Sequence, residues 1–283
     1  MRPLELITIN HLNAIVDGYD ATVEHLCTVF DAQVNRPIPG NPDNPDDTDA
    51  CLITVGDVIF ELFAPRRRGE RGQGRRLDRF GDHYVGVEFK VPDVVAAREQ
   101  CAELDVQIIN DLDRYFYTYP GSCLGISWEL WDGDWRENLG PTGLGPLHPR
   151  TYWRDDHPLG LDGLDRVSVA VCDLEAAIDR LTAVTGASML ERAGHPQAVA
   201  TGAALQVGDT VFELLAPTGE GPVSAHLDRY GEGIRSTVFK VMDLGRLQKH
   251  LTEKGIDLVP GDRESTLAVP AEQNHNLLFE FTE

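Results

Sequence analysis

Val55-Gly-Asp-Val-Ile-Phe-Glu-Leu-Phe-Ala-Pro65 is an apolar strand pattern with one glutamate, Glu61, near its centre. The pattern returns as Val207-Gly-Asp-Thr-Val-Phe-Glu-Leu-Leu-Ala-Pro217, in which Glu213 holds the corresponding place. A match of this length within one chain is the signature of a repeated structural unit. The sequence therefore predicts a duplicated domain.

Each half contains a shorter repeat, which opens with a strand, continues into a helix and closes on a strand with a central glutamate. The four closing segments are Ile59–Leu62, Ser127–Leu130, Val211–Leu214 and Leu278–Phe281. The clearest helix is Asp173–Leu181, where Asp173 is a predicted N-cap and the apolar residues fall at helical spacing. We predict an α+β fold of four βαβββ modules in two tandem domains, each a curved mixed sheet around a cavity with helices outside.

Length and composition agree with two soluble domains. The chain has 283 residues, of which 42% are hydrophobic and 25% charged. No run approaches the ~18 apolar residues of a membrane span, and the N-terminus lacks the apolar core of a signal peptide. We expect a cytoplasmic protein. Glycine and proline gather between Gly133 and Gly163, which predicts domains at 1–135 and 163–283 joined by a linker at 136–162.

A net charge of −21 argues against a nucleic-acid partner, because phosphates attract basic surfaces. The segment Arg66–Arg79 runs against this balance, since it carries seven arginines. One interpretation is a solvated loop attracted to the acidic loop Asp43–Asp49. The other is a flap that recruits an anionic substrate, because a local cationic patch steers anions even on an acidic protein. The expected partner is a small molecule, without nucleic acid or membrane. Monomer and homodimer both stay open.

The closing glutamates are the main candidates for chemistry. A carboxylate in a dry core would cost several kcal/mol unless it were paired. Since side chains alternate along a strand, each glutamate can point into the concave face of its sheet. The opening strands then contribute one residue each at matching positions. The predicted cavity positions are His11, Glu61, Gly86 and Glu129 in the first half, and Arg166, Glu213, Ser236 and Glu280 in the second.

With this repeat, the chain resembles the vicinal oxygen chelate superfamily, which includes glyoxalase I, methylmalonyl-CoA epimerase, extradiol dioxygenases and bleomycin-resistance proteins. The resemblance implies glyoxalase-like domains and a metal held by His11, Glu61 and Glu129. Gly86 stands where a second histidine is usual, and His83 reaches the site only if a bulge at Gly86 turns it. The metal would be Mn, Fe, Co, Ni, Zn or Mg, in the first domain only. The alternative is a buried His11 that bonds to Glu61 or Glu129 without a metal.

The second half has Arg166 in the place of His11. A guanidinium can neutralise carboxylates, so we predict a cluster of Arg166 with Glu213 and Glu280, and no metal there. In the first half, Tyr115 and Tyr117 lie on one face of a strand next to that of Glu129. They line the pocket or form an exposed face, and the sequence leaves both open.

The resemblance implies a metal-assisted isomerase, epimerase or lyase that acts on a small carbonyl substrate through an enediolate-type intermediate. Glu61 or Glu129 would move the proton. The alternative is a non-catalytic protein that binds and sequesters a drug or metabolite. A ring-cleaving dioxygenase fits less well, because neither half offers two histidines at the ligand positions. We favour the enzyme over the binding protein.

Overall fold

The computed structural model describes residues 2–41, 43, 47–69, 72–135 and 147–283. The first half contains β1 (Thr8–Ile15), α1 (Tyr19–Phe30), β2 (Gln33–Ile38), β3 (Thr48–Val55), β4 (Val58–Pro65), α2 (Gly72–Phe80), β5 (His83–Lys90), α3 (Val94–Glu103), β6 (Ile108–Asp111), β7 (Tyr115–Thr118), a 3₁₀ turn (Pro120–Ser122) and β8 (Ser127–Trp131). A short π-helical turn (Tyr152–Asp156) precedes the second half.

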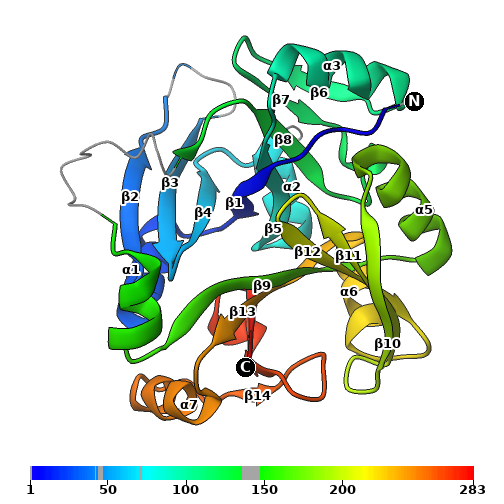
Figure 1. Cartoon of the computed structure of the whole chain (residues 1–283). Coiled ribbons are helices and arrows are strands. Elements are labelled where there is room, and N and C mark those ends of the chain that lie inside the picture. The colour runs from blue at the N-terminus through cyan, green and yellow to red at the C-terminus, as the bar shows by residue number, and fades with distance from the viewer. Residues whose placement is uncertain (1, 42, 44–46, 70–71, 136–146) are drawn as a thin grey trace.

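The second half repeats this order (Figure 1). It contains β9 (Leu161–Ala170), α5 (Leu174–Thr185), β10 (Ser188–His195), β11 (Ala200–Val207), β12 (Thr210–Pro217), α6 (Pro222–Tyr230), β13 (Gly233–Val241), α7 (Leu244–Glu253), β14 (Val259–Pro260), β15 (Leu267–Val269), a 3₁₀ turn (Ala271–Gln273) and β16 (Leu278–Thr282). Each half is thus two βαβββ modules, with α2 or α6 connecting them. The predicted fold class is confirmed.

Each half builds one eight-stranded mixed sheet. The strand orders are β2-β3-β4-β1-β5-β8-β7-β6 and β10-β11-β12-β9-β13-β16-β15-β14. At the centre of the first sheet β1 pairs antiparallel with β5, and each of these strands pairs parallel with the closing strand of its own module. The strands that carry the predicted site residues are therefore neighbours.

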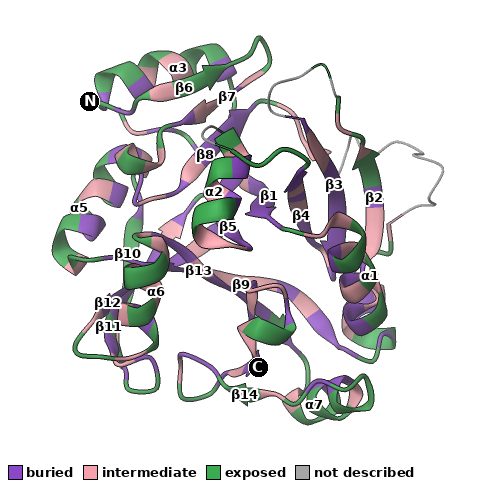
Figure 2. Ribbon diagram, turned by 180° about the vertical axis from the view of Figure 1, so that it is seen from behind, coloured by how far each residue is buried: buried purple, intermediate pink, exposed green. Residues whose placement is uncertain are grey.

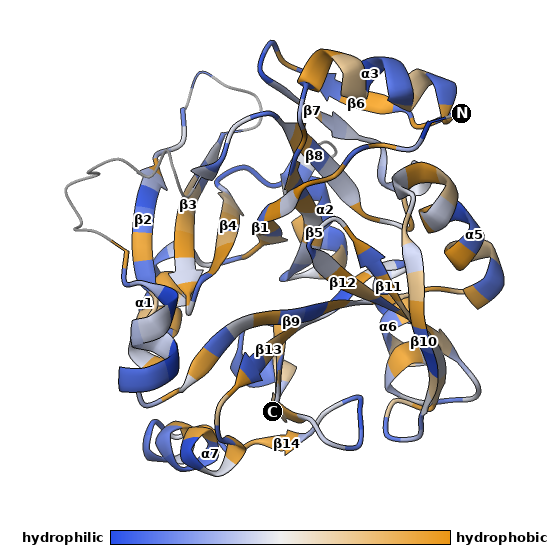
Figure 3. Ribbon diagram, in the orientation of Figure 1, coloured by the Kyte–Doolittle hydropathy of each residue, from blue (hydrophilic) through white to orange (hydrophobic). Residues whose placement is uncertain are grey.

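The helices begin where the sequence supplies an N-cap. The side chain of Asp173 accepts a hydrogen bond from the backbone N–H of Ala176 at 3.0 Å, as the sequence predicts. Asp93 and Asp243 cap α3 and α7 in the same way. Apolar and polar stretches alternate along α5, and its inner face buries Leu181 and Val184 (Figure 3).

One hydrophobic core joins the two halves. The rings of Phe60 and Phe279 lie 5.3 Å apart, and those of Trp128 and Phe212 lie 5.7 Å apart. These side chains alternate with the cavity-facing residues, so the two sheets pack through the faces opposite their cavities. Figure 2 shows buried residues concentrated in the strands, whereas α2 and α6 carry mainly exposed and intermediate residues.

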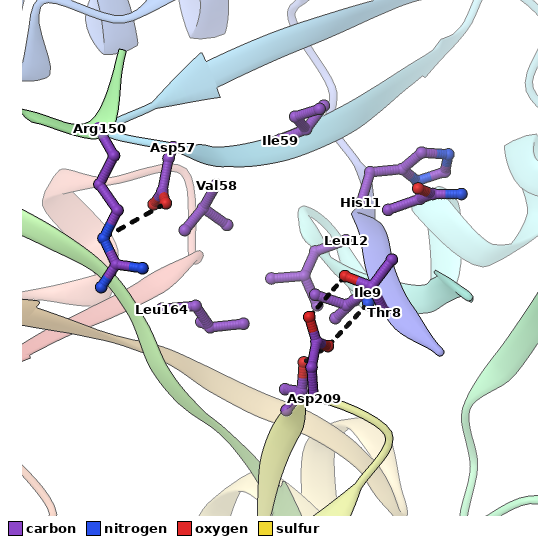
Figure 4. Close-up of a pocket in the computed structure, with 12 residues that line it drawn as sticks. Thr8, Ile9, His11, Leu12, Asp57, Val58, Ile59, Arg150, Leu164 and Asp209 are labelled. Atoms are coloured by element: carbon purple, nitrogen blue, oxygen red, sulfur yellow. Dashed lines mark hydrogen bonds and ion pairs between the residues drawn. The ribbon is translucent and has the colours of Figure 1, made fainter. Parts of the chain in front are cut away.

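Two β-hairpin turns, one from each half, contact segments outside their own sheet. Asp209, in the turn between β11 and β12, accepts a hydrogen bond from the hydroxyl of Thr8 at 2.6 Å and another from the backbone N–H of Ile9 at 3.3 Å. Asp57, in the matching turn of the first half, lies 3.8 Å from Arg150. A small cavity of about 140 Å³ lies between these two pairs (Figure 4).

The predicted linker overlaps the start of the second sheet, because β9 begins at Leu161. The predicted linker turns Gly140-Pro141 and Gly145-Pro146 lie outside the described residues. The exact domain boundaries stay a prediction. None of the helices in the described part of the chain combines the length and hydrophobicity that a membrane crossing requires.

Candidate functional site

Three buried side chains meet on the concave face of the first sheet. His11, Glu88 and Glu129 come from β1, β5 and β8, and each offers one ligand atom within 4.8 Å of the others. The strand register explains the meeting, because His11 lies opposite Glu88 and Glu88 lies beside Glu129. Their exposed fractions are 2%, 1% and 4%. The cluster brings together the predicted His11 and Glu129 with a carboxylate that was not predicted.

Glu88 supplies the side chain that is missing at Gly86. A Cβ atom on Gly86 would lie 2.3 Å from the carbonyl oxygen of Ser127, so no side chain fits there. Glu88 lies two residues further along the same strand and therefore on the same face. The signal for Glu88 in the sequence is the period of two along its strand, which places it on the face of Gly86.

Glu88 is also specific to the first half. Beside the closing glutamates, β1 places Asn13 next to Glu61, and β5 places Glu88 next to Glu129. The corresponding residues of the second half are Ser168 and Val238. Among these four positions, only β5 carries a carboxylate.

A β-bulge brings two consecutive residues of β1 to Glu88. The register shifts between Ile9 and His11, which leaves Asn10 without a partner on β5. The side-chain amide of Asn10 donates to Oε1 of Glu88 at 2.8 Å, while Nε2 of His11 lies 3.4 Å from its Oε2. The carboxylate is thus held from two sides.

Asn13 fixes the tautomer of His11. Nδ1 of the ring lies 2.6 Å from the side-chain oxygen of Asn13. An amide oxygen only accepts, so Nδ1 carries the proton and donates it. Nε2 then faces Glu88 and, at 3.9 Å, Glu61. The amide nitrogen of Asn13 also lies 3.5 Å from Glu129, which ties that carboxylate to the same frame.

The electrostatics of the cluster favour positive charge, which a protonated His11 or a bound cation can supply. Burial lowers the pKa of His11, but Glu88, Glu61 and Glu129 more than offset it and raise the pKa to about 10. Burial, together with the neighbouring Glu88, raises the pKa of Glu61 to about 7 and that of Glu129 well above its usual range. No lysine or arginine of the described residues forms an ion pair with these carboxylates. A ring nitrogen with several carboxylate oxygens is a donor set that suits a divalent cation.

A cavity of about 880 Å³ opens on the same face of the sheet. Glu61 lines it, and its side chain is 13% exposed, compared with 1% for His11. Tyr115 and Tyr117 also line the cavity, which answers the question that the sequence left open. On the other side the Trp135 ring lies 6.3 Å from that of His11. Glu61 is therefore the acidic group that a ligand in the cavity would meet.

His83 lies apart from this cluster. It pairs with Ile15 at the far end of β1, and its Nδ1–H donates to the carbonyl oxygen of Gly81 at 2.7 Å. Its ring stacks on Tyr230 at 5.9 Å and lines a separate small pocket of about 60 Å³ between the halves. The strand places it beyond the reach of His11, so it does not join the proposed ligands.

The second half holds arginine where the first holds histidine. Arg166 lies 3.2 Å from Glu213, as predicted, and Arg263 lies 2.6 Å from the same oxygen. Glu280 does not join them, which corrects the prediction. It accepts hydrogen bonds from the Ser236 hydroxyl at 2.5 Å and from a backbone N–H at 2.7 Å, because the loop before β15 brings polar groups to it. Burial raises its pKa to about 7.

Figure 4 shows the ring of His11 directed away from the ion pair of Asp57 with Arg150. Asn10 and His11 also line the cavity between the hairpin turns, so the same stretch of β1 borders both this cavity and the cluster. Of the arginine-rich segment, Arg66 forms two hydrogen bonds with Asp49, at 2.6 and 2.7 Å, as the first interpretation of this loop expects. Arg71 lies outside the described residues.

Two solved structures share the fold over 99% of this chain. The chain matches a mutant of 4-hydroxymandelate synthase from Streptomyces coelicolor with a TM-score of 0.74 and 14% identity, over 99% of this chain and 92% of that one. A xylose isomerase-like TIM barrel/4-hydroxyphenylpyruvate dioxygenase fusion protein matches with a TM-score of 0.63 and 13% identity, over 99% and 49% of the two chains. Methylmalonyl-CoA epimerase from Mycobacterium tuberculosis is 25% identical over 43% of this chain and 87% of that one, with a TM-score of 0.41.

No curated protein sequence shows significant similarity to the chain. A family model matches residues 8–120 and 163–278, one region in each of the two halves described above. The chain therefore belongs to the Glyoxalase/Bleomycin resistance protein/Dioxygenase superfamily.

Proposed function

We propose that the first half is a metal-dependent isomerase, epimerase or lyase that moves a proton beside the carbonyl group of a small molecule. The observation that carries the proposal is the cluster of His11, Glu88 and Glu129 beside a cavity that Glu61 lines. Buried carboxylates without a lysine or arginine partner are costly, and a divalent cation would remove that cost. The second half, where Arg263 and Arg166 neutralise Glu213, has no such need.

His11, Glu88 and Glu129 would hold the metal through Nε2 and two carboxylates. When bound, the metal supplies a Lewis acid that polarises a carbonyl group. Asn10 and Asn13 orient the ligand side chains through the hydrogen bonds described above. This arrangement differs from the sequence-based hypothesis, which used Glu61 as a ligand and did not include Glu88.

Glu61 is the proposed acid–base group, because its carboxylate lies 3.9 Å from His11 and lines the cavity. Its carboxylate would take a proton from the carbon next to the carbonyl and return it to the same or an adjacent carbon. Tyr115 and Tyr117 offer hydroxyl groups and aromatic faces to the substrate. Trp135 shields His11 from the other side and helps to exclude water.

The alternative is ligand sequestration without catalysis. The cavity of about 880 Å³ would suit it, since binding pockets for small molecules span about 300–1,000 Å³. A ring-cleaving dioxygenase is less well supported. Its usual site has two histidines and one carboxylate, whereas the described cluster has one histidine. The likeness to the synthase and to the dioxygenase fusion, at 14% and 13% identity, concerns the fold.

The test is elemental analysis of the purified protein beside His11→Ala, Glu88→Gln and Glu61→Gln, with His83→Ala as a histidine control outside the cluster. We expect about one divalent metal in the parent, the control and Glu61→Gln, and a loss of metal in the other two variants. Proton exchange of carbonyl compounds in D₂O, followed by NMR, then tests catalysis. It should stop in Glu61→Gln although the metal stays bound. Metal-free protein after reconstitution would retire the enzyme and leave sequestration.

A further inference from the structure

Arg76 is the one cationic side chain among the described residues that line the large cavity. It lies on α2, is half-buried, and also lines the small pocket that holds His83, so it borders both spaces. Glu61 is the one acidic residue in the same lining. The described wall of the cavity thus holds a single positive group and a single negative group, among amide, hydroxyl and apolar side chains.

Arg76 has no carboxylate partner within the described part of the chain. Other arginines of the same segment are paired, Arg66 with Asp49 and Arg68 with Asp17 and Asp78. Burial lowers the pKa of Arg76, and no acidic group raises it. Since a guanidinium remains charged in proteins, this positive group is partly desolvated without compensation. An anionic ligand in the cavity would supply the negative charge that this guanidinium lacks.

The position is specific to the half with the proposed metal site. The match of Leu77–Gly81 with Leu227–Gly231 places His226 at the point that corresponds to Arg76. The first half therefore differs from the second in two linked respects. It has Glu88 in place of Val238, and it has a guanidinium on the helix beside its cavity.

Building on the function proposed above, we propose that Arg76 anchors an oxyanion of the substrate, so that the enzyme acts on a carbonyl compound that carries a carboxylate or a phosphate. The fork of the guanidinium donates two parallel hydrogen bonds to either group. With the oxyanion at Arg76, the opposite end of the substrate extends to Glu61 on the sheet. Arg76 is a substrate-binding residue in this scheme and takes no part in proton transfer.

Two matched pairs of probes separate the two sources of the oxyanion. Levulinate is compared with methyl levulinate, its uncharged ester, and dihydroxyacetone phosphate is compared with dihydroxyacetone. Binding is measured by calorimetry on the full chain, with and without added metal. We expect the charged member of at least one pair to bind about 10-fold or more tightly than the neutral member. Preference within the first pair identifies a carboxylate substrate, and preference within the second identifies a phosphate.

The preference should vanish in Arg76→Gln and persist in part in Arg76→Lys. Arg75→Gln is the control, because Arg75 is an exposed neighbour on the same helix and carries the same charge. Equal affinity within both pairs for the parent protein, or an equal loss in Arg75→Gln and Arg76→Gln, overturns the proposal. Metal content is measured on the same samples. A parent protein without metal that still distinguishes the charged probes refutes the proposed reaction and retains the role of Arg76.

Discussion

His11 donates its Nδ1 proton to the side-chain oxygen of Asn13 across 2.6 Å, and this single contact directs Nε2 at the carboxylates. Outer hydrogen bonds of this kind typically contribute 10–100-fold to metal affinity. We expect Asn13→Ala to fold normally and to bind the metal about 10–100-fold more weakly. Competition with a chelator at fixed pH measures the effect. Ser168→Ala, the corresponding change in the second half, should leave the affinity unaltered.

Metal addition should stabilise the protein through the first half. A ligand at 100 times its Kd raises the free energy of unfolding by about 2.7 kcal/mol if it binds only the folded state. Glu88→Val, which copies the residue at position 238, should abolish most of the metal-induced rise in Tm. The prediction is wrong if none of the candidate divalent metals shifts the parent's Tm, or if Glu88→Val shifts as much as the parent.

Substitutions in the cluster of Glu213, Arg166 and Arg263 should differ in their effect on stability. Glu213→Ala removes the buried carboxylate that both guanidiniums contact and leaves Arg166 with Asp165 and Arg263 with Glu191, which should cost about 1.5–3 kcal/mol of stability. Arg166→Ala should cost less, because Arg263 still pairs with Glu213. Urea unfolding compares these variants with Glu191→Ala, whose side chain is 49% exposed and whose loss should cost at most about 1 kcal/mol.

Glu280 should make the protein less stable as the pH rises towards neutrality. Burial raises the pKa of its carboxyl from 4.5 to about 7, so between these values the folded state binds more protons than the unfolded state. Its contribution to stability is complete below about pH 4.5 and is lost as the pH passes 7. In Glu280→Gln the decline should shrink by on the order of 1–3 kcal/mol, measured as urea unfolding at several pH values. Parallel curves for variant and parent would contradict this.

His83 should make the protein less stable as the pH falls into the acidic range. Burial lowers the pKa of its ring from 6.5 to about 4, so the unfolded chain takes up a proton first as the pH falls. Stability is therefore lost between about pH 6.5 and 4. His83→Phe suits the aromatic surroundings of Phe80 and Tyr230 and should reduce the acid loss by on the order of 1–3 kcal/mol. The exposed His148 serves as control, and its replacement by Phe should leave the acid loss unchanged.

The fold could be predicted from the sequence because the duplication and the glutamate-centred strands constrain it four times over. Each module repeats the same periodicity, so a misjudged element in one copy is corrected by the others. The capped helix at Asp173 follows from local chemistry, since an aspartate at that position satisfies free N–H groups of the first turn. Local rules of this kind need no knowledge of distant contacts.

The site could be predicted only in part. His11, Glu61 and Glu129 lie together because the alternation of a strand and the symmetry of the repeat are visible in the sequence. The period of two places Glu88 on the same face as Gly86, but its contact with His11 depends on the bulge at Asn10, and a register between strands cannot be read from the sequence. Glu280 was misplaced for a similar reason, since its partners come from a loop whose course the sequence does not reveal.

The close approach of Gly86 to Ser127 limits how this protein could change. A Cβ atom there would lie 2.3 Å from a backbone oxygen, so a single substitution at this position has no room for an imidazole. A second histidine is easier to introduce at residue 88, whether by evolution or by design, because a side chain there already reaches the cluster. The backbone thus restricts which donor sets are accessible to this scaffold, independently of which would be chemically best.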